Sequence, residues 1–381
     1  MKLRTSLLSL AIPCLLAGLA ACKTTKVVEE KTPAEGTKPG DQQPGDTTPP
    51  DDGALDTLAP DWHTKASSYL DTRAADWLAN APNISNVKCA MSCHTTFSAS
   101  LAKAALGKAA NIPSADEART EFEKRVNEAD PVPFYGKSGD AKTIESRATE
   151  SVLNAVALTL GDVGTGGTLS DASKTALDKM WEQQSADGSW KWLEFNLEPW
   201  ETRNDFGVGI AALAVGRIPA DSTSGQAAGI EKMKTYVGKR LSAMVLHDKA
   251  VVLWASGTMP GLLDKAKADA IAKDLIAKQR DDGGFSLRSW GMGDLADEKA
   301  SSDGYATALA TLALCRGTEN GLTRPEVRNG LAWLAQTQKA DGSWPGVSTN
   351  SSGADVKQFM TDAATSYATV ALIECGKVKV N

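Results

Sequence analysis

The chain has no excess of basic residues. Its 41 Lys and Arg are outnumbered by 47 Asp and Glu, which gives a formal net charge of −6 at pH 7. Proteins that bind nucleic acid neutralise phosphates with Lys and Arg, so this balance argues against a nucleic-acid partner and favours a small or neutral one. Histidine is scarce too: there are three, and only His247 lies beyond residue 140, which leaves little material for a histidine-based metal site there.

The only long apolar run is at the N-terminus, and it is unlike a membrane span. Residues 1–21 begin with Lys2 and Arg4, continue through an apolar stretch broken by Pro13, and end in small residues. This is the anatomy of a secretory signal peptide. We therefore expect an exported protein.

The end of this leader, LAAC, resembles a bacterial lipobox. The resemblance implies cleavage before Cys22 and lipidation of that residue, and Lys23 favours sorting to the outer membrane of a Gram-negative cell. We expect a protein anchored by lipid in the bacterial envelope, facing the periplasm or the cell surface. Residues 22–60 are rich in Pro, Gly, Thr and acidic residues and poor in aromatics, a composition that predicts a disordered linker.

Beyond the linker, the chain contains three similar loops, each after a segment with helical spacing. They are QSADGSW (184–190), QRDDGGF (279–285) and QKADGSW (338–344). Each is followed by an Asp that opens an alanine-rich apolar segment, at Asp205, Asp303 and Asp362. The repeating unit is therefore a polar-faced helix, an Asp-Gly loop with an aromatic residue, and a buried helix.

Helix pairs that cannot bury their own apolar faces must stack, either as an open solenoid or as a closed ring. An extra pair without the loop motif falls around residues 246–257. Further helical patterns cover 62–79, 114–129, 142–160 and 171–184. This is enough helix for one closed ring, so we predict an all-α fold, an α/α toroid over 141–381, preceded by a separate helical segment over 61–140.

The segment RNGLAWLAQTQKADGSW (328–344) resembles the QW repeat of squalene-hopene and oxidosqualene cyclases. The same α/α toroid occurs in protein prenyltransferases, and similar loops occur in some pectate lyases. In the cyclases the glutamine caps a neighbouring helix and the Trp stacks on it. The resemblance thus implies a structural role for Gln184, Gln279, Gln338, Trp190, Phe285 and Trp344.

The catalytic motifs of these families are absent from the sequence. There is no DxDD, which supplies the strong acid of the cyclases, and no DDxxD for a diphosphate. The zinc ligands of a prenyltransferase cannot be assembled from His247 and the two C-terminal cysteines. A toroid by itself does not fix a function.

Asp205, Asp303 and Asp362 recur at one place in the repeat, so a ring would gather them at one end of the inner barrel. There they could raise one another's pKa and serve as a general acid or base. The alternative is that each caps its helix. Trp192, Phe195, Trp200 and Trp290, in the segments before the acids, could line a hydrophobic ligand pocket, or could simply pack the outer layer.

The segment KCAMSCHTTF (88–97) nearly spells a c-type haem attachment site. Such a site uses two thiols and an adjacent histidine that ligates iron, here Cys89, Cys93 and His94. Three residues separate the thiols instead of two. SCHTT also resembles the CxSCHT segment of uncharacterised bacterial envelope proteins that precedes a cyclase-like toroid, but Cys89 is one place out of register. Haem c, a local disulfide and another metal all remain open interpretations, because exported thiols are seldom free.

The sequence therefore supports several functions. The first is an enzyme or redox protein of the envelope, acting on or binding a hydrophobic, isoprenoid-like ligand, with a haem spectrum and a ligand-sized cavity at the end bearing the three acids. The second is a non-catalytic toroid that binds a protein, lipid or glycan, with a filled interior and a Cys89–Cys93 disulfide. The third is a polysaccharide lyase, for which Arg203 and Arg288 are the arginines of interest. Cys315 and Cys375 are expected at neighbouring helix ends, as a disulfide or as small core residues.

Overall fold

The computed structural model describes residues 52–81, 83–84, 87–136, 140–164, 166–350 and 353–378. The leader, the lipidation of Cys22 and nearly all of the expected linker lie outside the described residues. The chain divides into two units, Met1–Thr48 and Pro49–Asn381, and only the second is described below. No helix among its described residues combines the length and the apolar character needed to cross a membrane.

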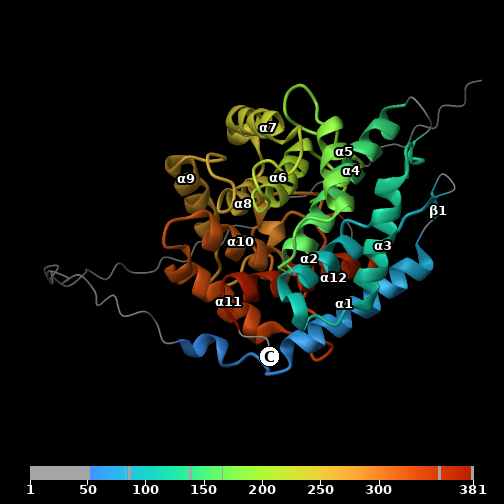
Figure 1. Cartoon of the computed structure of the whole chain (residues 1–381). Coiled ribbons are helices and arrows are strands. Elements are labelled where there is room, and N and C mark those ends of the chain that lie inside the picture. The colour runs from blue at the N-terminus through green and yellow to red at the C-terminus, as the bar shows by residue number, and fades with distance from the viewer. Residues whose placement is uncertain are drawn as a thin grey trace, which may run out of the picture. The chain divides into compact units, whose positions relative to one another are not determined.

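Six helices of the described chain form an inner ring. Around this ring α2 contacts α4, α4 contacts α6, and the series continues through α8 and α10 to α12, which returns to α2. Figure 1 shows α12, near the C-terminus, beside α2, near the N-terminus of the unit. The ring is therefore closed, as predicted. Its helices are α2 (Thr96–Leu106), α4 (Ala141–Gly164), α6 (Asn204–Val215), α8 (Leu246–Ser256), α10 (Gly304–Gly317) and α12 (Ala354–Glu374).

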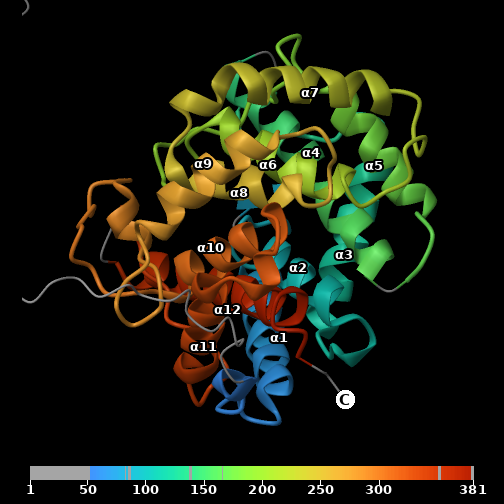
Figure 2. The same cartoon turned by 90° about the vertical axis from the view of Figure 1, so that its left-hand side faces the viewer.

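A second set of helices packs outside this ring. Each outer helix contacts an inner one, and α1 lies against both α2 and α12 (Figures 1 and 2). The protein is thus an all-α protein with the α/α toroid fold. The outer helices are α1 (Trp62–Asn80), α3 (Pro113–Asn127), α5 (Asp171–Glu182), α7 (Gln226–Arg240), α9 (Lys265–Ile276) and α11 (Pro325–Thr337).

Short elements connect the helices. An antiparallel hairpin of β1 (Asn83–Ile84) and β2 (Val87–Lys88) joins α1 to the segment before α2. The 3-10 helices are Asp52–Leu55, Gly107–Ala109, Leu241–Ala243, Leu287–Trp290 and Gly321–Thr323.

The expected boundary near residue 140 does not separate two packed units. Helices α1, α2 and α3 belong to the toroid, because α2 fills the place between α12 and α4 in the inner ring and α1 and α3 pack outside it. Without them α12 and α4 would expose the faces that they bury against α2. The N-terminal helices lack the repeated loop, so the sequence pattern did not connect them with the toroid.

The inner helices are buried because their residues are small and apolar. In α6 every residue from Asp205 to Val215 is buried. Gly207 has no room for a side chain, since a Cβ there would lie 2.3 Å from the ring of Trp192. The outer helix α5, in contrast, buries only one face. This contrast between inner and outer helices confirms the prediction from hydrophobic periodicity.

The three repeated loops connect consecutive outer helices. Gln184 donates through Nε2 to the Gly229 carbonyl of α7 at 3.0 Å, and Gln279 donates to the Glu326 carbonyl of α11 at 2.8 Å. Gln338 donates to the Trp62 carbonyl of α1 at 2.9 Å, so the last loop closes the outer layer. Each glutamine thus joins its loop to a carbonyl in the first turn of the next outer helix and does not accept from free amides.

The aromatic residues of these loops are buried against their own helices. Trp190 donates through Nε1 to the Met180 carbonyl at 2.7 Å, and Trp344 donates to the Leu334 carbonyl at 2.8 Å. Both indoles and Phe285 are fully buried. The loop residues thus hold outer helices together, the structural role that the QW resemblance implied, although the glutamines donate to carbonyls and do not cap a helix.

Cys315 and Cys375 form a disulfide, with their Cα atoms 6.0 Å apart. It joins the C-terminal ends of the neighbouring inner helices α10 and α12. Of the two interpretations left open by the sequence, the structure shows the disulfide.

Aromatic side chains cross the interior of the ring. The rings of Trp254 on α8 and Tyr367 on α12 lie 5.9 Å apart, although α10 separates these helices in the ring. Tyr367 contacts Tyr305 at 4.8 Å, and Tyr305 lies 5.9 Å from His247. We call the set Trp200, Phe206, His247, Trp254, Tyr305 and Tyr367 the axial cluster. It fills space that a terpenoid-sized ligand along the axis would need.

Candidate functional site

The three repeated aspartates have separate partners. Asp362 lies well inside α12 and accepts hydrogen bonds from Tyr69, Arg73 and Thr95. Asp205, in the first turn of α6, accepts from Tyr236 at 2.6 Å and from Arg240 at 3.1 Å. The two are thus parts of ion pairs between an inner and an outer helix, and neither caps its helix.

Asp303 is the N-cap of α10. It accepts from the Ala306 amide at 2.9 Å and from the Leu287 amide at 2.7 Å. Burial raises the pKa of its carboxyl to about 7, against the lowering effect of these amides. Of the three repeated aspartates, Asp303 is therefore the one that caps its helix. No bond joins any two of the three carboxylates in the described structure, and each has its own donors.

The predicted aromatic pocket residues are mostly part of the core. Trp192 donates to the Trp200 carbonyl at 2.6 Å, and Trp200 donates to the Tyr305 hydroxyl at 3.0 Å. Trp290 is 6% exposed and its Nε1 has no hydrogen-bond partner among the described residues. Phe195 lies at the surface, 37% exposed. These side chains are placed as packing residues.

The two arginines that a lyase would use, Arg203 and Arg288, already form hydrogen bonds within the protein. Arg203 makes hydrogen bonds of 2.6 and 2.5 Å to both oxygens of Glu198, and a third of 3.1 Å to Asp248. Two carboxylates thus neutralise its guanidinium. Arg288 donates to the Ser348 carbonyl at 2.8 Å. Arg203 is therefore poorly suited to binding the carboxylate of a uronic acid.

The two cysteines of the KCAMSCHTTF segment are free thiols in this structure. Cys89 is buried, its Sγ lies 3.0 Å from the Met91 carbonyl, and burial raises its pKa to about 12. Burial also raises the pKa of Cys93 well above its usual range. Both are therefore protonated at neutral pH.

His94, directly after Cys93, is held in one tautomer. The Thr95 hydroxyl donates to Asp362 at 2.8 Å, so its oxygen accepts from the His94 Nδ1–H, which lies at 2.7 Å. The Nε2 atom keeps its lone pair and has no hydrogen-bond partner among the described residues. Burial, with a smaller effect of Arg73, lowers the imidazole pKa to about 3. The ring stacks on Phe359 with centroids 3.9 Å apart. His94 is thus neutral, with Nε2 oriented as a hydrogen-bond acceptor.

Beside His94, a cavity of about 70 Å³ opens among α1, the segments before α2 and α4, the N-terminal half of α4 and the loop before α6. We call it the rim pocket. Trp77, Phe134, Leu153 and Leu193 make its apolar walls. Its polar side chains include those of Cys89, Cys93, His94, Tyr135, Glu150 and Glu201.

Glu201 is the unpaired acid of the rim pocket. Its carboxylate accepts no hydrogen bond from the part of the chain that the structure describes, whereas Glu150 forms two bonds of 2.7 Å with Arg125. Burial raises the pKa of Glu201 to about 7, with Lys142 acting weakly in the opposite direction. A mostly apolar pocket with a few polar groups and shifted pKa values has the character of a functional site.

A sequence motif contains Cys89, Cys93 and His94 but not Glu201. This residue lies in WKWLEFNLEPWETRND (190–205), where the aromatic residues are the more conspicuous feature. No short motif marks Glu201, because the fold alone brings it to the pocket that His94 also lines. Among the described residues, no group of three or more His, Cys, Asp or Glu side chains is placed to hold a metal ion.

No protein-family model matches the chain, and no curated protein matches it in sequence. Similar solved structures include ent-copalyl diphosphate synthase from Streptomyces platensis, with 15% identity and TM-score 0.45, where the match covers 73% of this chain and 50% of the synthase. The type II terpene cyclase MstE from Scytonema is 11% identical, with TM-score 0.45 and coverage of 81% and 98%. An unsaturated glucuronyl hydrolase specific for heparin is 12% identical, with TM-score 0.48 and coverage of 85% and 100%. These likenesses concern the arrangement of helices and not the chemistry.

Proposed function

We propose that the protein is a lipid-anchored envelope enzyme whose rim pocket performs acid–base chemistry on the end of a hydrophobic ligand. The observation that carries the proposal is the meeting of two groups in one pocket. These are Glu201, a carboxyl without a hydrogen-bonded partner among the described residues, and His94, whose orientation leaves the Nε2 lone pair free.

The two groups suit different parts in a proton transfer. Glu201 has a pKa of about 7, so at neutral pH it is partly protonated and can act as an acid, and its ionised fraction can act as a base. His94 is neutral and its pKa of about 3 makes it a weak base, so its Nε2 suits accepting a hydrogen bond from the reacting hydroxyl. A carboxyl of pKa about 7 is too weak to protonate an isolated alkene, so the chemistry it supports is proton transfer at a hydroxyl or beside a carbonyl.

The shape of the pocket restricts the ligand. About 70 Å³ admits one end of a molecule, and the apolar walls favour a hydrocarbon next to the reacting polar atom. The axial cluster occupies the interior, so the rest of the ligand would lie outside the ring. A protein tethered to a membrane by Cys22 is well placed to meet such amphipathic molecules.

The test uses the full lipoprotein in detergent micelles, incubated in D2O with a lipid extract of a Gram-negative envelope. Mass spectrometry then follows deuterium incorporation or cleavage. We expect turnover by the wild type, and a loss of about 10²–10⁴-fold in Glu201→Gln and His94→Asn. Glu194→Gln, an exposed acid on the same loop, is the matched control. Equal turnover in Glu201→Gln and wild type, or no product with any extract, would contradict the proposal.

Covalent haem c is a second candidate, favoured by the orientation of His94. A histidine that ligates metal usually donates its other ring N–H to a fixed acceptor, as Nδ1 does here through Thr95. Cys89 and Cys93 would supply the thiols for covalent attachment and His94 an iron ligand, and bound haem would supply electron transfer. The space does not suit the group: about 70 Å³ holds a few water molecules, far less than a porphyrin. We therefore derive no step through haem.

The haem proposal has its own test, an absorption spectrum and an intact mass of protein exported in a host that matures c-type cytochromes. Covalent attachment predicts a Soret band that survives denaturation and one haem added to the mass. Its loss in Cys93→Ser would assign the attachment. The same mass measurement checks lipidation of Cys22, because the lipid adds to the protein only if that residue is present.

A further inference from the structure

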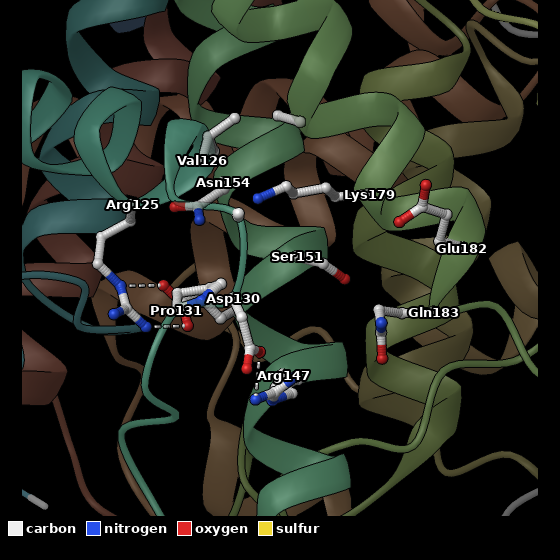
Figure 3. Close-up of a pocket in the computed structure, with 13 residues that line it drawn as sticks. Arg125, Val126, Asp130, Pro131, Arg147, Ser151, Asn154, Lys179, Glu182 and Gln183 are labelled. Carbon is white, nitrogen blue, oxygen red and sulfur yellow. Dashed lines mark hydrogen bonds and ion pairs between the residues drawn. The ribbon is translucent and has the colours of Figure 1, made fainter.

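A second pocket lies on the side of the toroid, away from the ring interior. It lies between α4, α5 and the segment that follows α3, and has a volume of about 210 Å³. We call it the side pocket. Figure 3 shows Lys179 extending from α5 toward Asn154 on α4, with Ser151, Glu182 and Gln183 around the same space.

Asn154 is the unusual residue of the side pocket. It is 5% exposed, and its amide makes no hydrogen bond with any residue that the structure describes, yet the amide atoms are not among the buried ones that lack a partner. They therefore face the open space of the pocket, where water or a ligand can bond them. Arg147 Nε, in contrast, is buried without a partner among the described residues, so it is not open to a ligand. Both side chains line the pocket.

The charged groups of the side pocket largely neutralise one another. Arg125 is paired with Glu150, and Arg147 Nη2 lies 2.7 Å from Asp130. Lys179 donates to the Glu128 carbonyl at 2.5 Å. The cations that line the pocket, Arg125, Arg147 and Lys179, are matched in number by the carboxylates Asp130, Glu150 and Glu182, so the pocket offers no excess positive charge to an anion. It offers hydrogen bonds instead, with a donor at the Asn154 amide and acceptors at the Asn154 and Glu182 oxygens.

We propose that the side pocket binds one neutral saccharide ring, such as the end of an envelope glycan. Vicinal hydroxyls both donate and accept, so they can satisfy the two sides of the Asn154 amide together. The volume is below that of pockets for drug-sized ligands and suits a single ring. Val126, Ala129 and Pro131 provide an apolar wall for the carbon face of that ring.

This pocket is distinct from the proposed reaction site. The ion pair of Arg125 and Glu150 lies at the boundary, because Glu150 lines both pockets. A glycan held in the side pocket would therefore position the toroid on the envelope without occupying the rim pocket. Saccharide binding and turnover at Glu201 can be tested separately.

The experiment is calorimetric titration of the full lipoprotein in detergent micelles with glucose and N-acetylglucosamine, and with glycine and inorganic phosphate as probes of other classes. We expect saccharide binding by the wild type, weakened at least tenfold in Asn154→Leu and in the shape-conserving Asn154→Asp. Asn111→Leu, at an exposed asparagine before α3, is the matched control and should bind as the wild type does.

A thermal melt distinguishes a ligand-binding amide from a structural one. Without saccharide, Asn154→Leu should melt close to the wild type, because the amide that it removes bonds no other residue that the structure describes. Saccharide should raise the melting temperature of the wild type and leave that of Asn154→Leu unchanged. Binding of glycine or phosphate in place of saccharide, no binding at all, or full affinity in Asn154→Leu would each overturn the proposal.

Discussion

Arg73 on α1 and Asp362 on α12 join the first and last α-helices of the described toroid. Arg73 Nε on α1 lies 2.9 Å from Asp362 Oδ1 on α12, and Nη2 lies 3.2 Å from Oδ2. The carboxylate is fully buried, and the Tyr69 hydroxyl donates to it at 2.8 Å. The same carboxylate accepts from Thr95, which holds His94. Asp362 therefore both joins α12 to α1 and, through Thr95, orients His94.

A similar arrangement of Tyr, Arg and Asp recurs between the outer helix α7 and the inner helix α6. Tyr236 and Arg240, four residues apart on α7, bind Asp205 on α6, as Tyr69 and Arg73 on α1 bind Asp362. Residues four apart lie on one face of a helix, so both side chains reach the same acceptor. The two sites differ in exposure: the Arg240 side chain is 47% exposed and that of Arg73 is 19% exposed.

Arg73→Met should destabilise the protein strongly. It leaves the buried Asp362 carboxylate without its cation, and removing one partner of a buried ion pair costs about 3–5 kcal/mol. Arg240→Met removes the equivalent, more exposed arginine and should cost less. Urea unfolding at pH 7 measures both free energies of unfolding. Equal losses in the two variants would show that burial of the pair does not set its contribution.

The loop glycines give a second test of the fold. Gly342 has φ of +88°, and a Cβ there would lie 2.3 Å from the Lys65 carbonyl oxygen of α1. Gly342→Ala should therefore lower the free energy of unfolding by about 1–3 kcal/mol or more. Gly238, in α7, is the control, since a Cβ there meets nothing within 4 Å. Gly238→Ala should stabilise the protein by up to about 1 kcal/mol in the same urea unfolding experiment. A loss in both variants would contradict the structural explanation.

The repeated loops predicted the toroid because their residues have local, recurring functions. Gln184, Gln279 and Gln338 each bind a carbonyl on the next outer helix, so a ring that repeats this bond also repeats the sequence around it. Burial of the alanine-rich helices follows from composition in the same way. The places of α1 to α3 in the toroid could not be predicted in this way. Helix α2 is held in the ring by packing against α4 and α12, and no repeated loop marks it in the sequence.

The site was predictable only in part, for a physical reason. Cys93 and His94 are adjacent in the chain, so a motif reveals them. Glu201 reaches the same pocket from a loop far along the sequence, and only the closed ring brings it there. The repeated position of Asp205, Asp303 and Asp362 suggested a shared function, but the partners differ: two bind arginines on outer helices and one caps α10.

The disulfide should contribute measurably to stability. Cys315 and Cys375 are separated by 60 positions, and closing a loop of this length restricts the unfolded chain by about 2–4 kcal/mol. Cys315→Ser combined with Cys375→Ser should lose this amount in urea unfolding. Reductant should lower the stability of the wild type and leave the double variant unchanged. An effect of reductant on the double variant would point to a bond elsewhere.

His94 should remain neutral in mildly acidic solution. Its pKa of about 3 arises mainly from burial, and the Thr95 oxygen accepts from Nδ1. Nitrogen-15 NMR should show the Nδ1–H tautomer unchanged from pH 7 to pH 5. In Thr95→Val the acceptor is lost, so the Nδ1–H signal should shift toward a mixture of tautomers. Protonation of His94 near pH 6.5 in the wild type would contradict its burial.

Glu201 should make the protein less stable as pH rises. Its pKa is about 7 in the folded protein against a usual value of 4.5, so between these values the folded state holds a proton that the unfolded state has lost. The favourable contribution is complete below pH 4.5 and disappears as pH passes 7.

Glu201→Gln removes this dependence. The variant should exceed the wild type in stability by about 2–3 kcal/mol at pH 8, and the difference should vanish near pH 4. Asp303, whose pKa shifts in the same direction, is present in both proteins and cancels from the comparison. Glu194→Gln, an exposed acid on the same loop, is the control for the change from Glu to Gln. Urea unfolding from pH 4 to pH 8 measures the effect, and a constant difference between wild type and Glu201→Gln would mean that the carboxyl titrates as an exposed one does.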